Sequence, residues 1–141
     1  MFTSVGNRSA SAYKRVSVET SVDNASPHHL VCLLFAALQQ AIGAARLGTE
    51  RGDIPAKIKQ ISIAIRILEE GLKAPLDLQN GGEIAANLDA LYEYCVGRLV
   101  VANAKNDVAV LDEVSRIIEP IASGWKQIGS QVSGYARPTT Q

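Results

Sequence analysis

Residues Gly81 to Asp107, GGEIAANLDALYEYCVGRLVVANAKND, decide the fold class of this chain. Apolar side chains recur through the stretch at steps of three and four residues, which is the spacing of one face of an α-helix. We expect its core seam to consist of Ile84, Leu88, Leu91, Cys95, Leu99 and Ala102. A second apolar set points away from that seam and consists of Tyr92, Val96 and Val100, flanked by Tyr94 and Val101. The helix is therefore either central in the protein or covered on one side by a partner.

Three further stretches have helical periodicity, so the sequence predicts four helices, at about 27–47, 54–72, 82–104 and 107–132. Ser26 before Pro27 predicts the start of the first helix, and Asp53 is the expected cap of the second. The last helix has the most regular spacing, Leu111, Val114, Ile118, Ile121, Trp125, Ile128 and Val132. Pro120 lies inside it and predicts a kink or a break near Ile118.

The second helix also has apolar residues on two sides. Its expected core seam alternates steps of four and three, as in helical bundles, and consists of Ile54, Ile58, Ile61, Ile65, Leu68 and Leu72. Ile63 and Ile67 lie about 200° around the helix from Ile61 and Ile65, at ~100° per residue. They form a second apolar strip on a side that is expected to be polar.

These patterns predict one all-α domain, an antiparallel up-and-down four-helix bundle with a short N-terminal arm or helix. No stretch alternates with a period of two, and no repeat is visible. We expect residues 1–24 to be a flexible arm, residues 25–133 to be the bundle and residues 134–141 to be a mobile tail.

Composition excludes several classes of function. Fourteen basic and fourteen acidic residues cancel, so no broad positive surface for nucleic acid or anionic lipid is expected. The longest unbroken apolar run, Leu30 to Leu38, is far shorter than the ~20 residues of a membrane span, and the first residues lack the apolar core of a secretion signal. A cytoplasmic protein without membrane insertion is expected. Cys32 and Cys95 are predicted to be buried free thiols.

No pattern indicates catalysis, so we predict no catalytic residue, no cofactor and no metal. A di-iron bundle needs inward Glu-x-x-His pairs, whereas the two histidines here, His28 and His29, are adjacent and do not face each other. Either histidine, if exposed, could serve a histidine phosphotransfer bundle, and this remains an alternative function. A structural bundle that buries its second apolar faces in a homodimer is another alternative.

Three blocks in this order resemble the flagellin export chaperone family, FliS. They are ASPHHL at residues 25–30, NLDALYEY at 87–94 and RLVVANAKND at 98–107. The arm SAYKRVSV at 11–18 and the late Trp125 also fit that family, and the resemblance extends from Ser11 to about Gln131.

The resemblance implies a cytoplasmic, non-enzymatic helical bundle that binds the disordered C-terminal segment of flagellin. Such a chaperone prevents premature polymerisation and delivers flagellin to the flagellar type III export apparatus, with an export gate protein as a further possible partner. The spare apolar faces would then hold client helices in grooves of the bundle. A homodimer is possible when the client is absent.

We predict from helical phase and from the resemblance which residues contact the client. These are Tyr13 and Val16 of the arm, Ile63 and Ile67 of the second helix, Tyr94 and Val101 of the third, and Ile117 of the fourth. The resemblance also implies that the arm, with Tyr13, folds over a groove when the client is absent. We therefore expect the arm to be a displaceable cover.

Overall fold

The structure is a computed structural model that describes residues 26–132, with side chains described as far as Gly129. Within this range the chain forms helices and no strand, in the order α2 (Pro27–Arg51), α3 (Ile54–Arg66), a π-helical segment η2 (Ile67–Lys73), α4 (Gly82–Lys105) and α5 (Val108–Val132). The prediction of an all-α bundle is confirmed. The expected arm and tail lie outside the described residues.

The predicted helix starts at Ser26 and Asp53 are confirmed by capping bonds. The Ser26 hydroxyl accepts from the backbone N–H of His29 at 3.1 Å, and the Asp53 carboxylate accepts from that of Ala56 at 3.2 Å. The first helix continues to Arg51, beyond its predicted end at residue 47, and is closed by Gly52 in the left-handed region (φ 71°). Residues Gly52 and Asp53 alone join α2 to α3, so the two helices are antiparallel neighbours.

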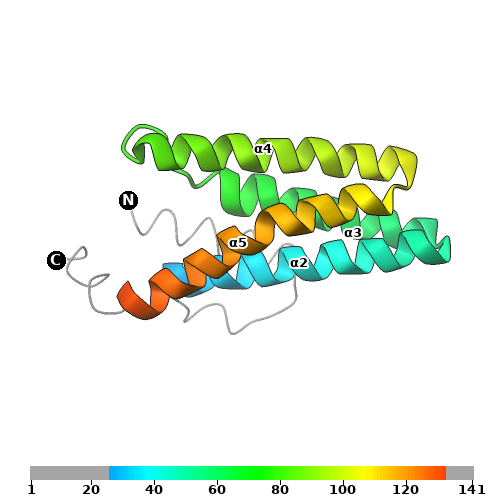
Figure 1. The fold of residues 1–141 in the computed structure, drawn as a ribbon, viewed down its shortest axis with the longest axis horizontal. Helices are drawn as coiled ribbons and strands as arrows, with labels where there is room; N and C mark the ends of the chain where they lie inside the picture. Colours follow the sequence, from blue (N-terminus) through cyan, green and yellow to red (C-terminus); the bar gives the residue numbers. More distant parts are fainter. Residues whose placement is uncertain (1–25, 133–141) are drawn as a thin grey trace.

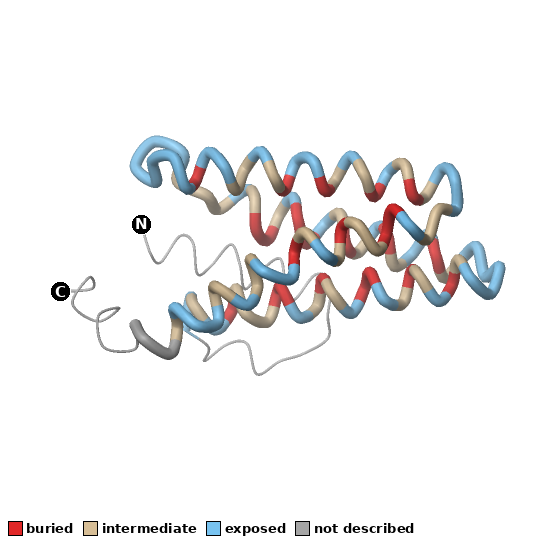
Figure 2. Tube along the Cα trace, in the orientation of Figure 1, coloured by how far each residue is buried: buried red, intermediate tan, exposed pale blue. Residues whose placement is uncertain are grey.

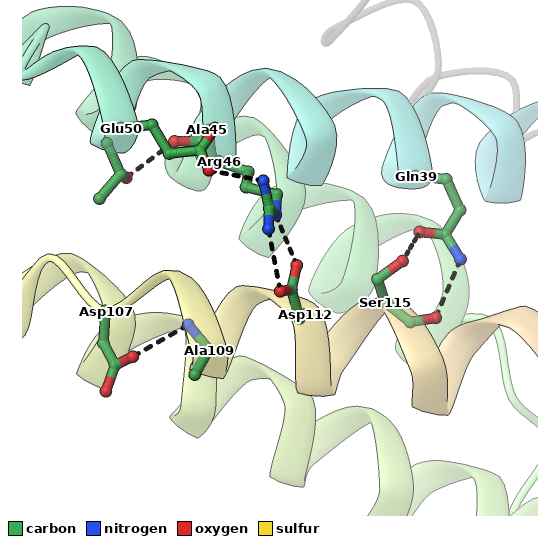
Figure 3. Close-up of polar contacts among 9 residues, drawn as sticks. Gln39, Ala45, Arg46, Glu50, Asp107, Ala109, Asp112 and Ser115 are labelled. Carbon is green, nitrogen blue, oxygen red and sulfur yellow. Dashed lines mark hydrogen bonds and ion pairs between the residues drawn. The ribbon is translucent and has the colours of Figure 1, made fainter.

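Consecutive helices pack side by side, and α5 returns to pack on α2 (Figure 1). Contacts between α2 and α5 show the antiparallel direction, because Arg46 contacts Asp112 and Gln39 contacts Ser115. Figure 3 shows both contacts, which join α2 to the first half of α5. In the same way Lys57, at the start of α3, contacts the end of α4. Lys73 of η2 contacts Asp89, near the beginning of α4.

All four helices contribute to one core (Figure 2). On α4 the buried stripe consists of Ala85, Tyr92, Cys95, Leu99 and Ala102. The stripe is rotated from the predicted one, since Tyr92 was expected to point away from the core and is only 3% exposed. Burial raises the pKa of the Tyr92 hydroxyl to about 12.

The predicted seam of the second helix is wrong at its first two positions. Ile54 and Ile58 are 42% and 45% exposed, whereas Lys57 is buried. The Lys57 ammonium group donates to the backbone oxygen of Asn103 at 2.9 Å and to the side-chain oxygen of Asn106 at 2.5 Å. A cation at this place satisfies a free carbonyl at the end of α4 and lies at the negative end of its dipole, so it takes the inner position.

Ile67 does not face away from the core as predicted. The chain becomes π-helical at Ile67, which changes the rotation per residue, and both Ile67 and Leu68 are fully buried. Ile63, one turn earlier, is half-buried and packs against the core.

Pro120 does not divide the last helix, because α5 is continuous from Val108 to Val132.

The apolar composition of α2 is that of a core helix here. It is long and apolar enough to pass for a membrane span by composition, but the same residues pack against α3, η2 and α5.

Candidate partner-binding groove

Helix α5 contacts α2 in both of its halves, whereas its polar contacts with α4 lie near its beginning. Its polar contacts with α4 come from Glu113, which binds Tyr94 and Arg98. Its contacts with α2 continue to Trp125, which binds His28. Figure 1 shows the resulting divergence, with the second half of α5 crossing away from the first half of α4.

The divergence leaves the first half of α4 without cover from α5, although η2 packs on another side of it. Ile84 and Ala102 are 18 residues apart, which is five turns at 3.6 residues per turn, so their side chains point in about the same direction. Ala102 is 1% exposed, whereas Ile84 is 74% exposed. The prediction that Ile84 belongs to the core is therefore wrong, because α5 has left α4 at that level.

Helix α5 shows the same change along its length. Val110, Leu111, Val114 and Ile118 are buried, but from Glu119 through Gly129 every side chain is half-buried or exposed (Figure 2). Ile117 and Ile121 follow Glu113 by one and two turns, so they lie on the side of α5 that faces α4. Ile128 continues this side and is 46% exposed.

We define the α4/α5 groove by the apolar residues on these two surfaces, namely Ile84, Leu88 and Leu91 of α4 and Ile117, Ile121 and Ile128 of α5. Leu88, Ile117 and Ile121 are partly buried and pack against the core. Ile84 and Ile128 are the most exposed of the six residues. The α4 side, from Ile84 to Tyr94, is about 15 Å long at 1.5 Å per residue, which matches three turns of a helix.

Tyr94 stands where the groove meets the packed part of the bundle. Its ring is 47% exposed, and its hydroxyl donates to one Glu113 oxygen at 2.5 Å while the Arg98 guanidinium donates to the other at 2.9 Å. These two hydrogen bonds hold the pKa of the Glu113 carboxyl below its ordinary value, and the same carboxylate raises the pKa of Tyr94. The cluster fixes the closed end of the groove.

The structure brings together three of the seven predicted contact residues. Tyr94 and Val101 are seven residues apart, two turns of α4, and so share the side that faces α5, where Ile117 lies. Ile63 is on α3, which packs on α2 and α4. Ile67 is in the core, and Tyr13 and Val16 lie outside the described residues.

Sequence reasoning missed the most open apolar residues of α4 and α3. Ile84, Ile54 and Ile58 fit the apolar spacing of a core seam, and no local signal marks them as exposed. Val100 of α4 is 54% exposed and adds to the accessible apolar surface. Exposed large apolar side chains that gather on one protein are typical of interaction surfaces.

The two histidines have different surroundings. His29 is exposed, but His28 is half-buried, stacks on Trp125 and shares a 2.7 Å hydrogen bond between its Nε2 and the Trp125 backbone oxygen. His28 is therefore not freely exposed, and its Nε2 already has a partner. Residues 26–132 contain no cluster of three or more His, Cys, Asp and Glu that could hold a metal ion.

Comparison with known proteins adds the family. The model of the family described as flagellar protein FliS matches residues 9–132. The chain is 46% identical to the flagellar secretion chaperone FliS of Salmonella typhimurium over 133 residues, which are 94% of this chain and 96% of that protein. It is also 46% identical over 116 residues to the flagellar secretion chaperone FliSB of Pseudomonas aeruginosa, covering 82% of this chain and 91% of the relative. A flagellar secretion chaperone FliS of Bacillus subtilis is 31% identical over 109 residues, covering 77% and 80%. The all-α bundle and a match over nearly its whole length place this chain in the FliS family of flagellar secretion chaperones.

Proposed function

We propose that this chain binds the disordered C-terminal segment of flagellin in the cytoplasm, keeps flagellin from polymerising early and delivers it to the flagellar type III export apparatus. The relatives are named flagellar secretion chaperones, which makes a flagellar protein the client. The observation that carries the proposal is the α4/α5 groove, where Ile84 is 74% exposed on the core-facing side of α4.

The chemistry of the groove fits an amphipathic helix. Such a helix places apolar side chains at steps of three and four residues into an apolar groove between two helices. The residues that define the α4/α5 groove are all apolar, and Arg98 and Glu113 form an ion pair with each other at its closed end. A client helix would therefore bury apolar area against these residues.

Chaperoning for export needs binding that can be reversed. A client segment that folds on binding loses conformational entropy, which lowers its affinity for a given buried area and favours later release. On this proposal the protein acts by masking the client and carrying it, without catalysis or a cofactor. An export gate protein would then bind the loaded complex.

The N-terminal arm is proposed as a displaceable cover of the groove. Tyr13 and Val16 lie outside the described residues, so this proposal rests on the resemblance to the family. Deletion of residues 1–18 should raise the fluorescence of a dye that binds apolar surface and should increase the affinity for the client. Unchanged dye binding together with unchanged client affinity would contradict a covering role.

Isothermal titration with the last ~40 residues of the flagellin from the same organism tests the main proposal. We expect one segment per chaperone and a negative heat-capacity change, because apolar area is buried. No heat of binding from a protein that circular dichroism shows to be helical would overturn it. Size-exclusion chromatography with light scattering on the same sample would show whether a second copy covers the groove instead.

A further inference from the structure

His28 and Trp125 form a reciprocal contact between the beginning of α2 and the second half of α5. The His28 Nε2 donates to the Trp125 backbone oxygen at 2.7 Å, and the Trp125 Nε1 donates to the His28 backbone oxygen at 3.1 Å. The two rings are stacked, with their centroids 5.0 Å apart and their planes inclined by 16°. The residues are 97 positions apart in the sequence, so this contact joins the first helix described to the last.

Gly129 makes room for the contact. A Cβ atom at residue 129 would lie 1.7 Å from Cε1 and 2.2 Å from Nε2 of His28. The imidazole ring therefore packs directly on the backbone of α5, one turn beyond Trp125. Any side chain at this position would displace the ring.

We propose that His28, Trp125 and Gly129 form a clasp that holds the second half of α5 on α2 and thereby keeps the α4/α5 groove open. They are positioning residues for partner binding, since they set the distance between the walls of the groove from outside it. This inference rests on the proposed function only in naming the flagellin segment as the partner that binds in the groove.

The second half of α5 packs against the core only through partly buried side chains, namely Ile121, Ala122 and Trp125. From Glu119 through Gly129 no side chain is fully buried, whereas the first half of α5 contributes four buried side chains to the core. The side-chain contacts Arg46–Asp112 and Gln39–Ser115 join α2 to the first half of α5 (Figure 3). The clasp joins α2 to the second half of α5.

The opposing force is hydrophobic. Closing α5 onto α4 would bury the exposed side chains of Ile84 and Ile128 and the parts of Leu88 and Ile121 that are still accessible. Burial of apolar area favours that closure. The reciprocal hydrogen bonds and the stacked rings are lost on closure, so they oppose it and favour the open groove.

The substitution Gly129→Ala tests the clasp without removing any of its polar groups. The added methyl group must displace the His28 ring, and alanine is otherwise a better helix former than glycine. Gly43→Ala is the matched control, because a Cβ at residue 43 of α2 meets no atom within 4 Å. Trp125 is the only tryptophan of the chain, so intrinsic fluorescence reports on the clasp directly.

We expect Gly129→Ala to shift Trp125 fluorescence, to lower the binding of an apolar-surface dye and to weaken binding of the flagellin segment about tenfold or more relative to Gly43→Ala. In a His28→Ala background the added effect of Gly129→Ala should vanish, because the ring it displaces is gone. Trp125→Phe keeps an aromatic ring but loses the Nε1 donor, and should weaken binding by a smaller factor.

Three results would overturn the clasp: unchanged tryptophan fluorescence in Gly129→Ala, altered fluorescence with client affinity equal to that of Gly43→Ala, or additive effects of Gly129→Ala and His28→Ala. If the unsubstituted protein does not bind the flagellin segment, the proposed function fails. Dye binding then tests the clasp alone. Reduced dye binding in Gly129→Ala supports closure of the groove, whereas unchanged or increased dye binding contradicts it.

Discussion

The Tyr94 hydroxyl donates to the Glu113 carboxylate at 2.5 Å, which ties α4 to α5 at the point where the two helices begin to diverge. Arg98 donates to the other oxygen of the same carboxylate at 2.9 Å. One acidic side chain of α5 therefore accepts from two consecutive turns of α4. The closed end of the groove depends on its being ionised.

This dependence predicts how stability changes with pH. The hydrogen bonds from Tyr94 and Arg98 lower the pKa of Glu113 in the folded protein from its ordinary value of 4.5. The resulting stability is fully present above pH 4.5 and is lost as the pH falls through the lowered pKa. Urea unfolding should show that Glu113→Gln is less stable than the unsubstituted protein at neutral pH, and that the difference shrinks as the pH falls below 4.5. A difference that does not change with pH would contradict the cluster.

Helical periodicity predicts the local features of this fold but not those that depend on contacts between helices. Periodicity predicted the helices, and capping chemistry predicted the starts at Ser26 and Asp53, because both are local properties. The burial of Lys57 and the rotation at Ile67 depend on the end of α4 and on a π-helical segment. Neither has a signal in the neighbouring residues.

The groove itself shows the same limit. Ile84 has the spacing of a core residue but is 74% exposed, at the level where the second half of α5 diverges from α4 (Figure 1). That departure involves His28 and Trp125, which are 97 positions apart. No residue near His28 in the sequence indicates its contact with Trp125.

Lys57 should be required for stability although it is charged and buried. The residue is 4% exposed. Its ammonium group donates to the Asn103 backbone oxygen and to the Asn106 side-chain oxygen. Lys57→Met removes the donor and leaves both oxygens without it, at a cost of about 1–3 kcal/mol in the free energy of unfolding. Lys59→Met, on the exposed side of α3, is the control and should change that free energy by less than about 0.5 kcal/mol. Equal effects in urea unfolding would show that the position of Lys57 is unimportant.

The two thiols should differ in reactivity. Cys95 is 0% exposed, and burial raises its pKa to about 11. Burial also raises the pKa of Cys32, but this thiol is only half-buried and lies beside His28. Because the thiolate is the reactive form, Ellman's reagent at about pH 8 should modify one thiol of the native protein and two after denaturation. Cys32→Ser should abolish the native reaction. Two thiols that react at the same rate without denaturant would contradict the burial of Cys95.

Ile84 gives the sharpest test of where the client binds. Because its side chain is 74% exposed, Ile84→Asp should change the free energy of unfolding by less than about 0.5 kcal/mol, and a carboxylate in the first turn of α4 suits the helix dipole. In the groove, however, an unpaired charge facing an apolar client helix must lose its water. We expect the affinity for the flagellin segment, measured by isothermal titration, to fall about tenfold or more.

Leu47→Asp provides the matched control for Ile84→Asp. Leu47 is 45% exposed on α2, which does not line the α4/α5 groove, so the same charge is introduced at an accessible apolar residue elsewhere on the bundle. Affinity should then be close to that of the unsubstituted protein. If Leu47→Asp weakened binding and Ile84→Asp did not, the client would occupy a different apolar surface, and the strip of Ile54, Ile58 and Val100 would be the next to substitute.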